Sequence, residues 1–221
     1  MRRTVIPELL DDDLGTEAEI AASLKDLRHI NQWFGGVRTT TKLLRRVARA
    51  RGLRNLSILE VGAGNGDVPL LTQRVLAGYG LGVEVTLLDR VWSHLPRSGQ
   101  ASVAGDVLDL PFRDGTFDVV GCSLLAHHFE PETVVKFANE SLRVARQAVL
   151  INDLIRSRLH LLLVYLGLPL FRSRITWHDA PASVRRAYTC GEMCSMLADV
   201  GANKIQLSRH YMFRMGVLLW K

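Results

Sequence analysis

The stretch from Ile58 to Pro69 constrains the fold of this chain more than any other. It reads Ile-Leu-Glu-Val-Gly-Ala-Gly-Asn-Gly-Asp-Val-Pro. Its apolar start predicts a buried strand, its three alternate glycines predict a tight loop, and Asp67 can cap the helix that follows. A strand, a loop and a helix start in this order leave the backbone bare where a ligand can lie against it.

The acids that flank these glycines indicate the charge of the ligand. A dinucleotide site would place its third glycine five residues after the first, at the position of Asp67, and would keep the helix N-terminus free for a pyrophosphate. Glu60 and Asp67 would repel that pyrophosphate. The loop therefore favours a cationic ligand.

Residues 60–66 resemble the first motif of the class I S-adenosylmethionine-dependent methyltransferases. The cofactor of that family carries an ammonium and a sulfonium group, which is the charge that the loop favours. The resemblance implies S-adenosylmethionine as the cofactor and a Rossmann-like α/β fold. On this motif alone, a glycine-rich turn that only lets a helix pack close to a sheet stays the alternative.

Strand and helix patterns alternate from residue 56 onward, and this predicts a doubly wound, parallel sheet. Five strands are expected at 57–61, 83–88, 101–107, 117–122 and 148–151. Residues 204–208 and 216–220 have the length of the antiparallel hairpin that completes the family's mostly parallel seven-stranded sheet. We expect one compact unit, with an N-terminal helical lid over 1–55 and a methyltransferase domain over 56–221, in which 154–188 is a substrate-side insertion.

Polar residues after the strands predict the other cofactor contacts. Asp89 ends the second strand, where a carboxylate can accept hydrogen bonds from both ribose hydroxyls. Gly105-Asp106-Val107 is similar to the family's second motif, in which the acid or its neighbouring amide reads the adenine amino group. The predicted cofactor-binding residues are Glu60, Gly62, Ala63, Gly64, Asp67, Asp89, Arg90, Gly105, Asp106, Val107 and Ser123.

Two segments outside this core bear on the substrate. Residues 16–50 have the periodicity of two helices, broken by Trp33-Phe34-Gly35-Gly36, which forms either a lid hinge or plain packing. Residues 159–171 are almost all apolar but too few to span a bilayer, which needs roughly 20 residues. We expect them to form a pocket wall, core or a contact with a membrane surface.

Histidines are the candidates for a general base, which a phenol or a carbon acid would need near neutral pH. His127 and His128 follow the fourth strand, and His178 precedes Asp179 in the predicted substrate region. Adjacent residues point apart on a helix or a strand, so at most one of the first two should face the site. The predicted catalytic residues are His128 and His178, and the predicted substrate or lid residues are Trp33, Phe34, His127 and Trp177.

Three later segments indicate a narrower group within this family. Asn152-Asp153-Leu154, His178-Asp179 and the run at 183–188 are similar to bacterial type-11-like methyltransferases that act on quinone or polyketide-like compounds. This implies methylation of a hydrophobic small molecule in secondary metabolism, on a phenolic, quinone or polyketide hydroxyl. The alternatives are a nucleic-acid methyltransferase, a peripheral-membrane lipid or quinone methyltransferase, and a non-catalytic cofactor-binding protein.

Charge and cysteine content address the partners and the compartment. The net charge of +6 would suit nucleic acid, but no Asn-Pro-Pro-Tyr or Asp-Pro-Pro-Tyr run exists to clamp a flipped base, so no nucleic-acid partner is expected. An odd count of three cysteines indicates a reducing compartment, and Cys190 and Cys194 lack a second pair, so no metal is expected. The N-terminus runs into Glu8 and Asp11-Asp12-Asp13 instead of an apolar signal core, which predicts a cytoplasmic protein.

Overall fold

The computed structural model describes residues 1–11, 14–96 and 99–221 of the 221-residue chain. Two members of the acidic run, Asp12 and Asp13, lie outside the described residues.

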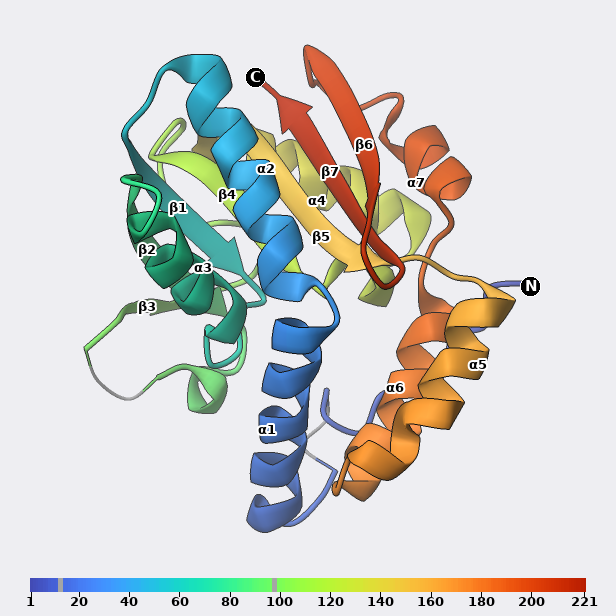
Figure 1. The fold of residues 1–221 in the computed structure, drawn as a ribbon. Coiled ribbons are helices and arrows are strands. Elements are labelled where there is room, and N and C mark those ends of the chain that lie inside the picture. Colours follow the sequence, from blue (N-terminus) through green and yellow to red (C-terminus); the bar gives the residue numbers. More distant parts are fainter. Residues whose placement is uncertain (12–13, 97–98) are drawn as a thin grey trace.

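The centre of the molecule is a seven-stranded sheet in the order β3-β2-β1-β4-β5-β7-β6 (Figure 1). Strands β1 to β5 run parallel, and β7 pairs antiparallel with both β5 and β6. The predicted doubly wound sheet with a C-terminal antiparallel hairpin is therefore confirmed. The strands are β1 (Asn55–Val61), β2 (Gly82–Asp89), β3 (Ala101–Ala104), β4 (Phe117–Ser123), β5 (Ala145–Leu154), β6 (Lys204–His210) and β7 (Arg214–Trp220).

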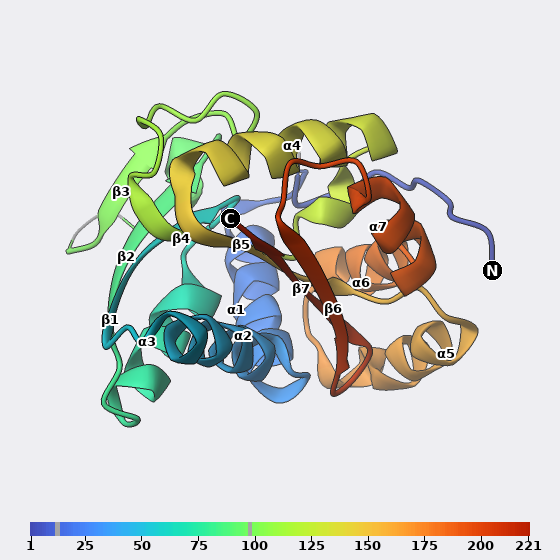
Figure 2. The same cartoon turned by 90° about the horizontal axis from the view of Figure 1, so that it is seen from above.

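Helices cover both faces of the sheet (Figure 2). One face packs under α2 (Gly36–Arg51) and α3 (Asp67–Ala77), and the other packs under α4 (Pro131–Val144) and α7 (Cys190–Leu197). The central strands are apolar on both faces because both are covered, as parallel sheets require. The largest core cluster joins β1, β4, β5 and β7 to the fully buried Phe137 of α4.

Two predicted strands have different lengths in the structure. The third strand ends at Ala104, and Gly105 and Asp106 already lie in the turn that follows, where Asp106 bridges to Asp109. The fifth strand is longer than predicted, because Asn152 and Asp153 continue the pairing with β7 and are fully buried. The polar side chains of Asn152 and Asp153 predict the end of the strand. In the structure they are buried within it, because Asn152 donates to Thr40 of α2 and Asp153 pairs with His127.

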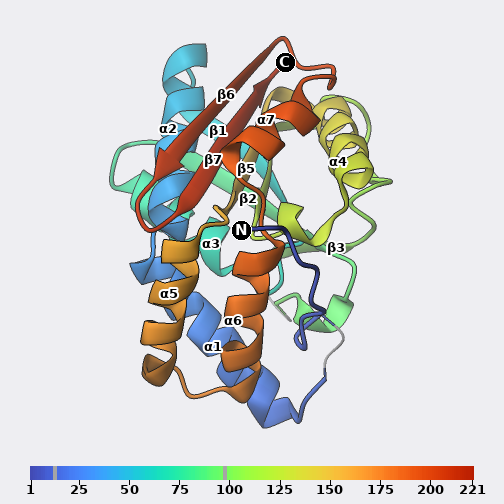
Figure 3. The same cartoon turned by 90° about the vertical axis from the view of Figure 1, so that its right-hand side faces the viewer.

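Three helices extend beyond the carboxyl ends of the parallel strands (Figure 1). They are α1 (Glu17–Trp33), α5 (Arg158–Gly167) and α6 (Arg174–Arg186), and α6 packs against both of the others. Figure 3 shows α5 and α6 side by side in front of α1. Helix α1 begins at a capping box, in which the Thr16 side chain accepts from the backbone of Glu19 and the Glu19 side chain accepts from that of Thr16.

The two predicted N-terminal helices are present, and they have different surroundings. Helix α2 contributes Leu43, Leu44, Val47 and Ala48 to the core, whereas α1 lies over the end of the sheet. The turn between them needs glycine because the tip of the β6–β7 hairpin approaches it closely: a Cβ on Gly35, whose φ is +86°, would lie 2.7 Å from the Tyr211 carbonyl oxygen. The domain boundaries at 55, 154 and 188 stay predictions.

Candidate functional site

The glycine loop after β1 has the backbone conformation that the sequence predicts. Gly62, Gly64 and Gly66 have φ values of +59°, +51° and +74°, in the left-handed region that favours glycine. A Cβ on Gly66 would lie 2.6 Å from Leu87 Cδ1, whereas a Cβ on Gly64 would meet no described atom within 4 Å. Gly66 therefore permits helix packing, while Gly64 presents bare backbone to open space.

Asp89 connects this loop to the end of β2 and the turn after β3. Its Oδ2 accepts from the Gly64 amide at 2.8 Å and its Oδ1 from the Val91 amide at 2.9 Å. Its backbone carbonyl accepts from Gly105 at 3.0 Å. A carboxylate offers about four acceptor sites, so both oxygens can still accept from ribose hydroxyls.

The other predicted cofactor residues surround this edge of the sheet. The exposed Asp106 accepts from the Leu108 amide at 2.9 Å, and Val107 beside it is buried. Ser123 ends β4, and Arg90 is exposed after β2. Ala63 lies within the glycine loop and donates its amide to the Leu88 carbonyl.

The two acids of the first motif have different environments. Asp67 is half-buried, which raises the pKa of its carboxyl, and lies 3.6 Å from Arg28 of α1. Glu60 is 2% exposed, and burial raises the pKa of its carboxyl to about 7. Its side chain lies against Gly121, where a Cβ would come within 2.7 Å of Oε2, in a small cavity also lined by Thr40. The contact of Glu60 with a cofactor stays a prediction.

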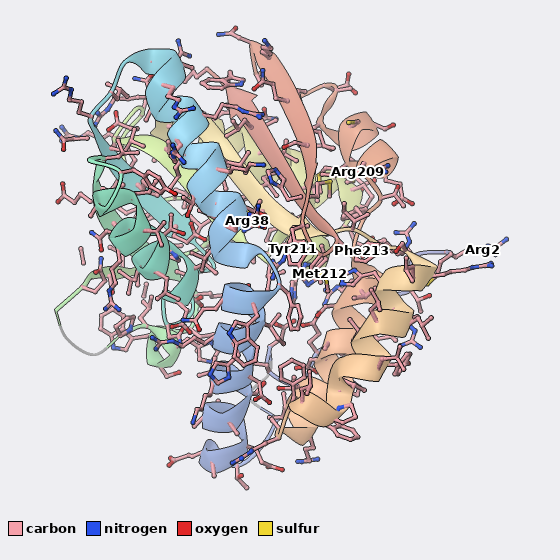
Figure 4. The ribbon with its side chains drawn as sticks, in the orientation of Figure 1. Arg2, Arg38, Arg209, Tyr211, Met212 and Phe213 are labelled. Atoms are coloured by element: carbon pink, nitrogen blue, oxygen red, sulfur yellow. The ribbon has the colours of Figure 1, made fainter. Side chains whose placement is uncertain are left out.

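A cavity of about 250 Å³ lies beyond the carboxyl ends of the strands. Its walls come from α1, α5, α6, the loop after β4, the N-terminal segment and the β6–β7 hairpin. Figure 4 shows Tyr211, Met212 and Phe213 of that hairpin between α2 and α5. Most of the lining is apolar, including Leu27, Ile30, Phe34, Leu124, Leu163, Val164, Phe171, Val184 and Met212.

Leu124 and Leu125 join the cavity to the glycine loop. Leu124 lines the cavity with a φ of +59°, a conformation that is strained for a leucine. Its neighbour Leu125 packs on Gly62, since a Cβ there would lie 2.8 Å from Leu125 Cδ1. The cavity and the predicted cofactor loop therefore meet at the turn after β4.

One wall of the cavity is polar and centres on His127, which is 2% exposed. Its Nδ1 lies 2.7 Å from Asp153 Oδ1, and its Nε2 lies 3.5 Å from Glu8 Oε1. Burial by itself would lower the pKa of His127, but the carboxylates of Asp153 and Glu8 raise it to about 10. Each ring nitrogen of His127 therefore faces a carboxylate oxygen.

His128 lies in the same wall. Its Nδ1 is 2.8 Å from Asp11 Oδ2, and its Nε2 is 3.7 Å from Glu8 Oε1. The expectation that at most one of His127 and His128 can face the site is wrong, because both line the cavity. They lie in the single 3₁₀ turn Ala126–His128, and two flexible side chains can converge from adjacent positions even though their Cβ atoms diverge.

The remaining predicted residues separate into two groups. Phe34 lines the cavity. His178 does not: its side chain is 41% exposed on α6 and pairs with Asp179 at 2.8 Å. Trp33 and Trp177 are 60% and 48% exposed, and neither lines the cavity. The structure thus brings one of the two predicted catalytic histidines to the cavity.

Three polar residues of this region were missed as site residues. Glu8 and Asp11 appeared only as part of an acidic N-terminus, and Arg214 lies between the two strands predicted at 204–208 and 216–220. Arg214 is 1% exposed, lines the cavity and donates to Asn31 Oδ1 at 2.8 Å. An arginine that interrupts the apolar run 212–219 is a signal that could have been found, whereas the acids carry no local signal.

Comparison with known proteins agrees with this geometry. Residues 59–151 match the family model of the "Methyltransferase domain". No curated protein matches the chain.

Three solved structures share the fold. A SAM-dependent methyltransferase from Aquifex aeolicus is 17% identical with a TM-score of 0.53, over 80% of this chain and 88% of that chain. The plantazolicin methyltransferase BpumL in complex with SAH is 12% identical with a TM-score of 0.69, over 96% of this chain and 93% of that chain. The structure of the same enzyme with a pentazolic desmethylPZN analog and SAH is 12% identical with a TM-score of 0.67, over 93% of this chain and 92% of that chain.

The open space at Gly64 can be tested with a matched pair of variants. Gly64→Ala should keep the fold at a cost of about 1–2 kcal/mol of backbone strain and weaken binding of S-adenosylhomocysteine at least about tenfold, because the methyl group fills the cradle. Gly80→Ala is the control, since Gly80 has a φ of +70° and an equally open Cβ position away from the site. Titration calorimetry with thermal unfolding measures both, and equal affinity in the two variants would contradict the assignment.

The buried Glu60 predicts a pH dependence of stability. The unfolded chain loses this proton near 4.5 and the folded protein near 7, so Glu60 lowers the free energy of unfolding as pH rises between these values. Glu60→Gln removes this titration, so its stability relative to wild type should rise by about 3 kcal/mol from pH 4.5 to 7 and then level off. Urea unfolding across this range measures it, with the exposed Glu84→Gln as control; a flat difference for Glu60→Gln would refute the prediction.

Proposed function

Since this chain is a class I S-adenosylmethionine-dependent methyltransferase of the type-11-like kind, matched over residues 59–151, we propose that it methylates a hydrophobic small molecule. The acceptor atom is a phenolic, quinone or polyketide hydroxyl oxygen. The observation that carries this proposal is the apolar cavity of about 250 Å³ that meets the glycine loop at Leu124 and Leu125. Its size and lining are those of a site for a small apolar ligand with few polar contacts.

The residues that would hold the cofactor fit its chemistry. Gly64 leaves the space that a close-lying ligand needs, and Asp89 has acceptor capacity for two ribose hydroxyls. Asp106 and Val107 offer an acceptor and an apolar surface for adenine. When bound, S-adenosylmethionine supplies an electrophilic methyl group on its sulfonium sulfur.

The chain itself then has to orient the acceptor and keep water away. The walls from α1, α5 and α6 are mostly apolar and would exclude water, and the polar wall at Glu8, His127 and His128 would face the acceptor's hydroxyl. Holding two reactants in line supplies up to about 7–11 kcal/mol of barrier reduction. We therefore assign acceptor orientation to this polar wall, which includes the predicted catalytic residue His128.

Several arginines that contribute to the positive net charge are paired with carboxylates of the same chain or are buried. Arg143 pairs with Asp114 and Glu140, and Arg146 pairs with Asp118. Arg156 and Arg214 are buried, and Arg3 pairs with Glu130. Arginines held in this way are less available to phosphates, which supports a small-molecule acceptor.

A membrane-associated acceptor is the second candidate, and the outer face of α5 favours it. Leu159, Leu162, Leu166 and Leu170 are 54–70% exposed, and the exposed Arg158 and Arg172 flank them. An apolar face with cationic ends fits the interface of an anionic lipid surface. Among the described residues, no helix is long and apolar enough to cross a bilayer.

We place the protein in the cytoplasm, since its three thiols are free.

The substrate class is tested by transfer of a labelled methyl group from the cofactor to a panel of phenols, quinones, fatty acids and bulk tRNA. A phenol or quinone should be the positive class. On that acceptor, His128→Ala should slow methylation about 10²-fold because the hydroxyl loses its orientation, and the exposed His178→Ala should stay within about twofold of wild type. Transfer to tRNA alone, or equal rates in the two variants, would refute the proposal.

The membrane candidate is resolved by the same assay with the acceptor in anionic phosphatidylglycerol vesicles or in detergent micelles. Leu166→Glu should slow methylation only of the vesicle-borne acceptor, because it charges the face of α5 outside the cavity. The same rate for wild type and Leu166→Glu in vesicles would refute membrane contact through this face.

A further inference from the structure

A cluster of metal-ligating side chains lies at the polar wall of the cavity. Ligand atoms of Glu8, His127 and His128 all lie within 4.8 Å of one another. The Glu8 Oε1 atom is 3.5 Å from His127 Nε2 and 3.7 Å from His128 Nε2. Donor atoms about 2.0–2.1 Å from a tetrahedral Zn²⁺ are separated by roughly 3.4 Å, so the two distances to Glu8 Oε1 are close to those of a zinc site.

Two atoms of this cluster are buried without a hydrogen-bond partner. Within the described part of the chain, neither Glu8 Oε1 nor His127 Nε2 has one. Unpartnered buried polar atoms are rare because each costs about 1–3 kcal/mol. Here both atoms belong to the same cluster and lie close to a third donor atom, that of His128. A cation bound between the three atoms would give both unpartnered atoms a partner.

Both imidazoles are held as they are in metal sites. His127 Nδ1 lies 2.7 Å from Asp153, and His128 Nδ1 lies 2.8 Å from Asp11. A carboxylate on the far nitrogen fixes the ring orientation and makes the near nitrogen a better ligand. The Nε2 atoms of both histidines lie near the same carboxylate oxygen, Glu8 Oε1.

The third ligand is firmly positioned although it lies near the N-terminus. The amides of Leu9 and Leu10 donate to the two oxygens of Asp179 at 2.8 and 3.0 Å. Arg3 donates to Glu130 and to the carbonyls of Phe129 and His127. The segment that carries Glu8 is therefore fastened to α6 and to the histidine turn itself.

From this geometry we propose that Glu8 Oε1, His127 Nε2 and His128 Nε2 bind one first-row divalent cation, which takes the place of the proton on His127 Nε2 and releases it to solvent. Zn²⁺ best fits two imidazoles and one carboxylate. Three protein ligands leave a coordination position open, which is the pattern of catalytic and not structural sites. All three residues line the cavity, so that position faces the acceptor. The cation would bind the acceptor's hydroxyl oxygen and polarise it as a Lewis acid.

The part of the cation in methyl transfer rests on the proposed function, but its binding does not. Metal binding can be measured without turnover, so the two proposals fail separately. A chain that binds the ion and methylates nothing refutes the function alone, and a chain that methylates phenols without binding the ion refutes the site alone.

The test is titration of the chelator-treated, full-length protein with Co²⁺, followed by visible absorption, and with Zn²⁺, followed by metal analysis after gel filtration. One equivalent should bind, with a Co²⁺ spectrum of nitrogen and oxygen ligands. Glu8→Gln and His128→Ala should each weaken binding at least about 10²-fold, and Asp11→Asn should weaken it about tenfold through the ring of His128. His178→Ala is the matched control, an exposed histidine also paired with an aspartate, and should bind as wild type does.

Circular dichroism and binding of S-adenosylhomocysteine show whether each variant is folded. If Glu8→Gln does not fold, Asp11→Asn decides, because Asp11 is 44% exposed and its replacement keeps the side-chain shape. Absence of stoichiometric binding to the wild-type protein overturns the proposal. Binding that His178→Ala abolishes, or that Glu8→Gln, His128→Ala and Asp11→Asn leave unchanged, overturns it as well.

Discussion

The buried ion pair of His127 and Asp153 joins the sheet to the cavity. Asp153 Oδ2 accepts from the His127 amide at 2.9 Å and Oδ1 faces the imidazole at 2.7 Å, so one carboxylate fixes both the backbone and the ring of the turn after β4. Because Asp153 lies within β5, this turn has the rigidity of the central sheet. The N-terminal segment then fastens to the same turn through Arg3 and Glu8.

Burying this cluster of charged side chains lowers the free energy of unfolding, which indicates that the cluster serves the function of the cavity. Burying charged groups is expensive, and breaking a buried pair by removing one partner costs about 3–5 kcal/mol. Well-packed apolar side chains would stabilise the same region at no desolvation penalty. The polar wall nevertheless places Glu8, His127 and His128 at a cavity whose lining is mostly apolar. An apolar acceptor with one polar group would find a charged partner at this wall.

Local patterns were enough to predict the fold and the backbone conformation of the glycine loop. The glycine loop, Asp89 and the hairpin tail are each encoded within a short stretch, because strand periodicity and left-handed glycine positions are local properties. The long-range contacts of the cavity could not be obtained in this way. Asp11 meets His128 across 117 residues, and Arg214 meets Asn31 across 183. Neither partner of these pairs carries a local pattern that identifies the other.

The role of the apolar stretch at 159–171 shows the same division. Its composition predicted burial, a pocket wall or a membrane contact, and α5 has two faces: Leu163 and Val164 line the cavity, and Leu162 and Leu166 are exposed. Periodicity cannot assign these faces, because leucine occupies both. Only the packing of α6 against α5 distinguishes them.

A crystal structure with S-adenosylhomocysteine tests most directly the claim that the cofactor edge and the cavity form one site. The ribose hydroxyls should contact Asp89, and the sulfur atom should point past Leu124 into the cavity lined by His128. A sulfur atom that points away from this cavity, or is closed off from it by Leu125, would contradict the account.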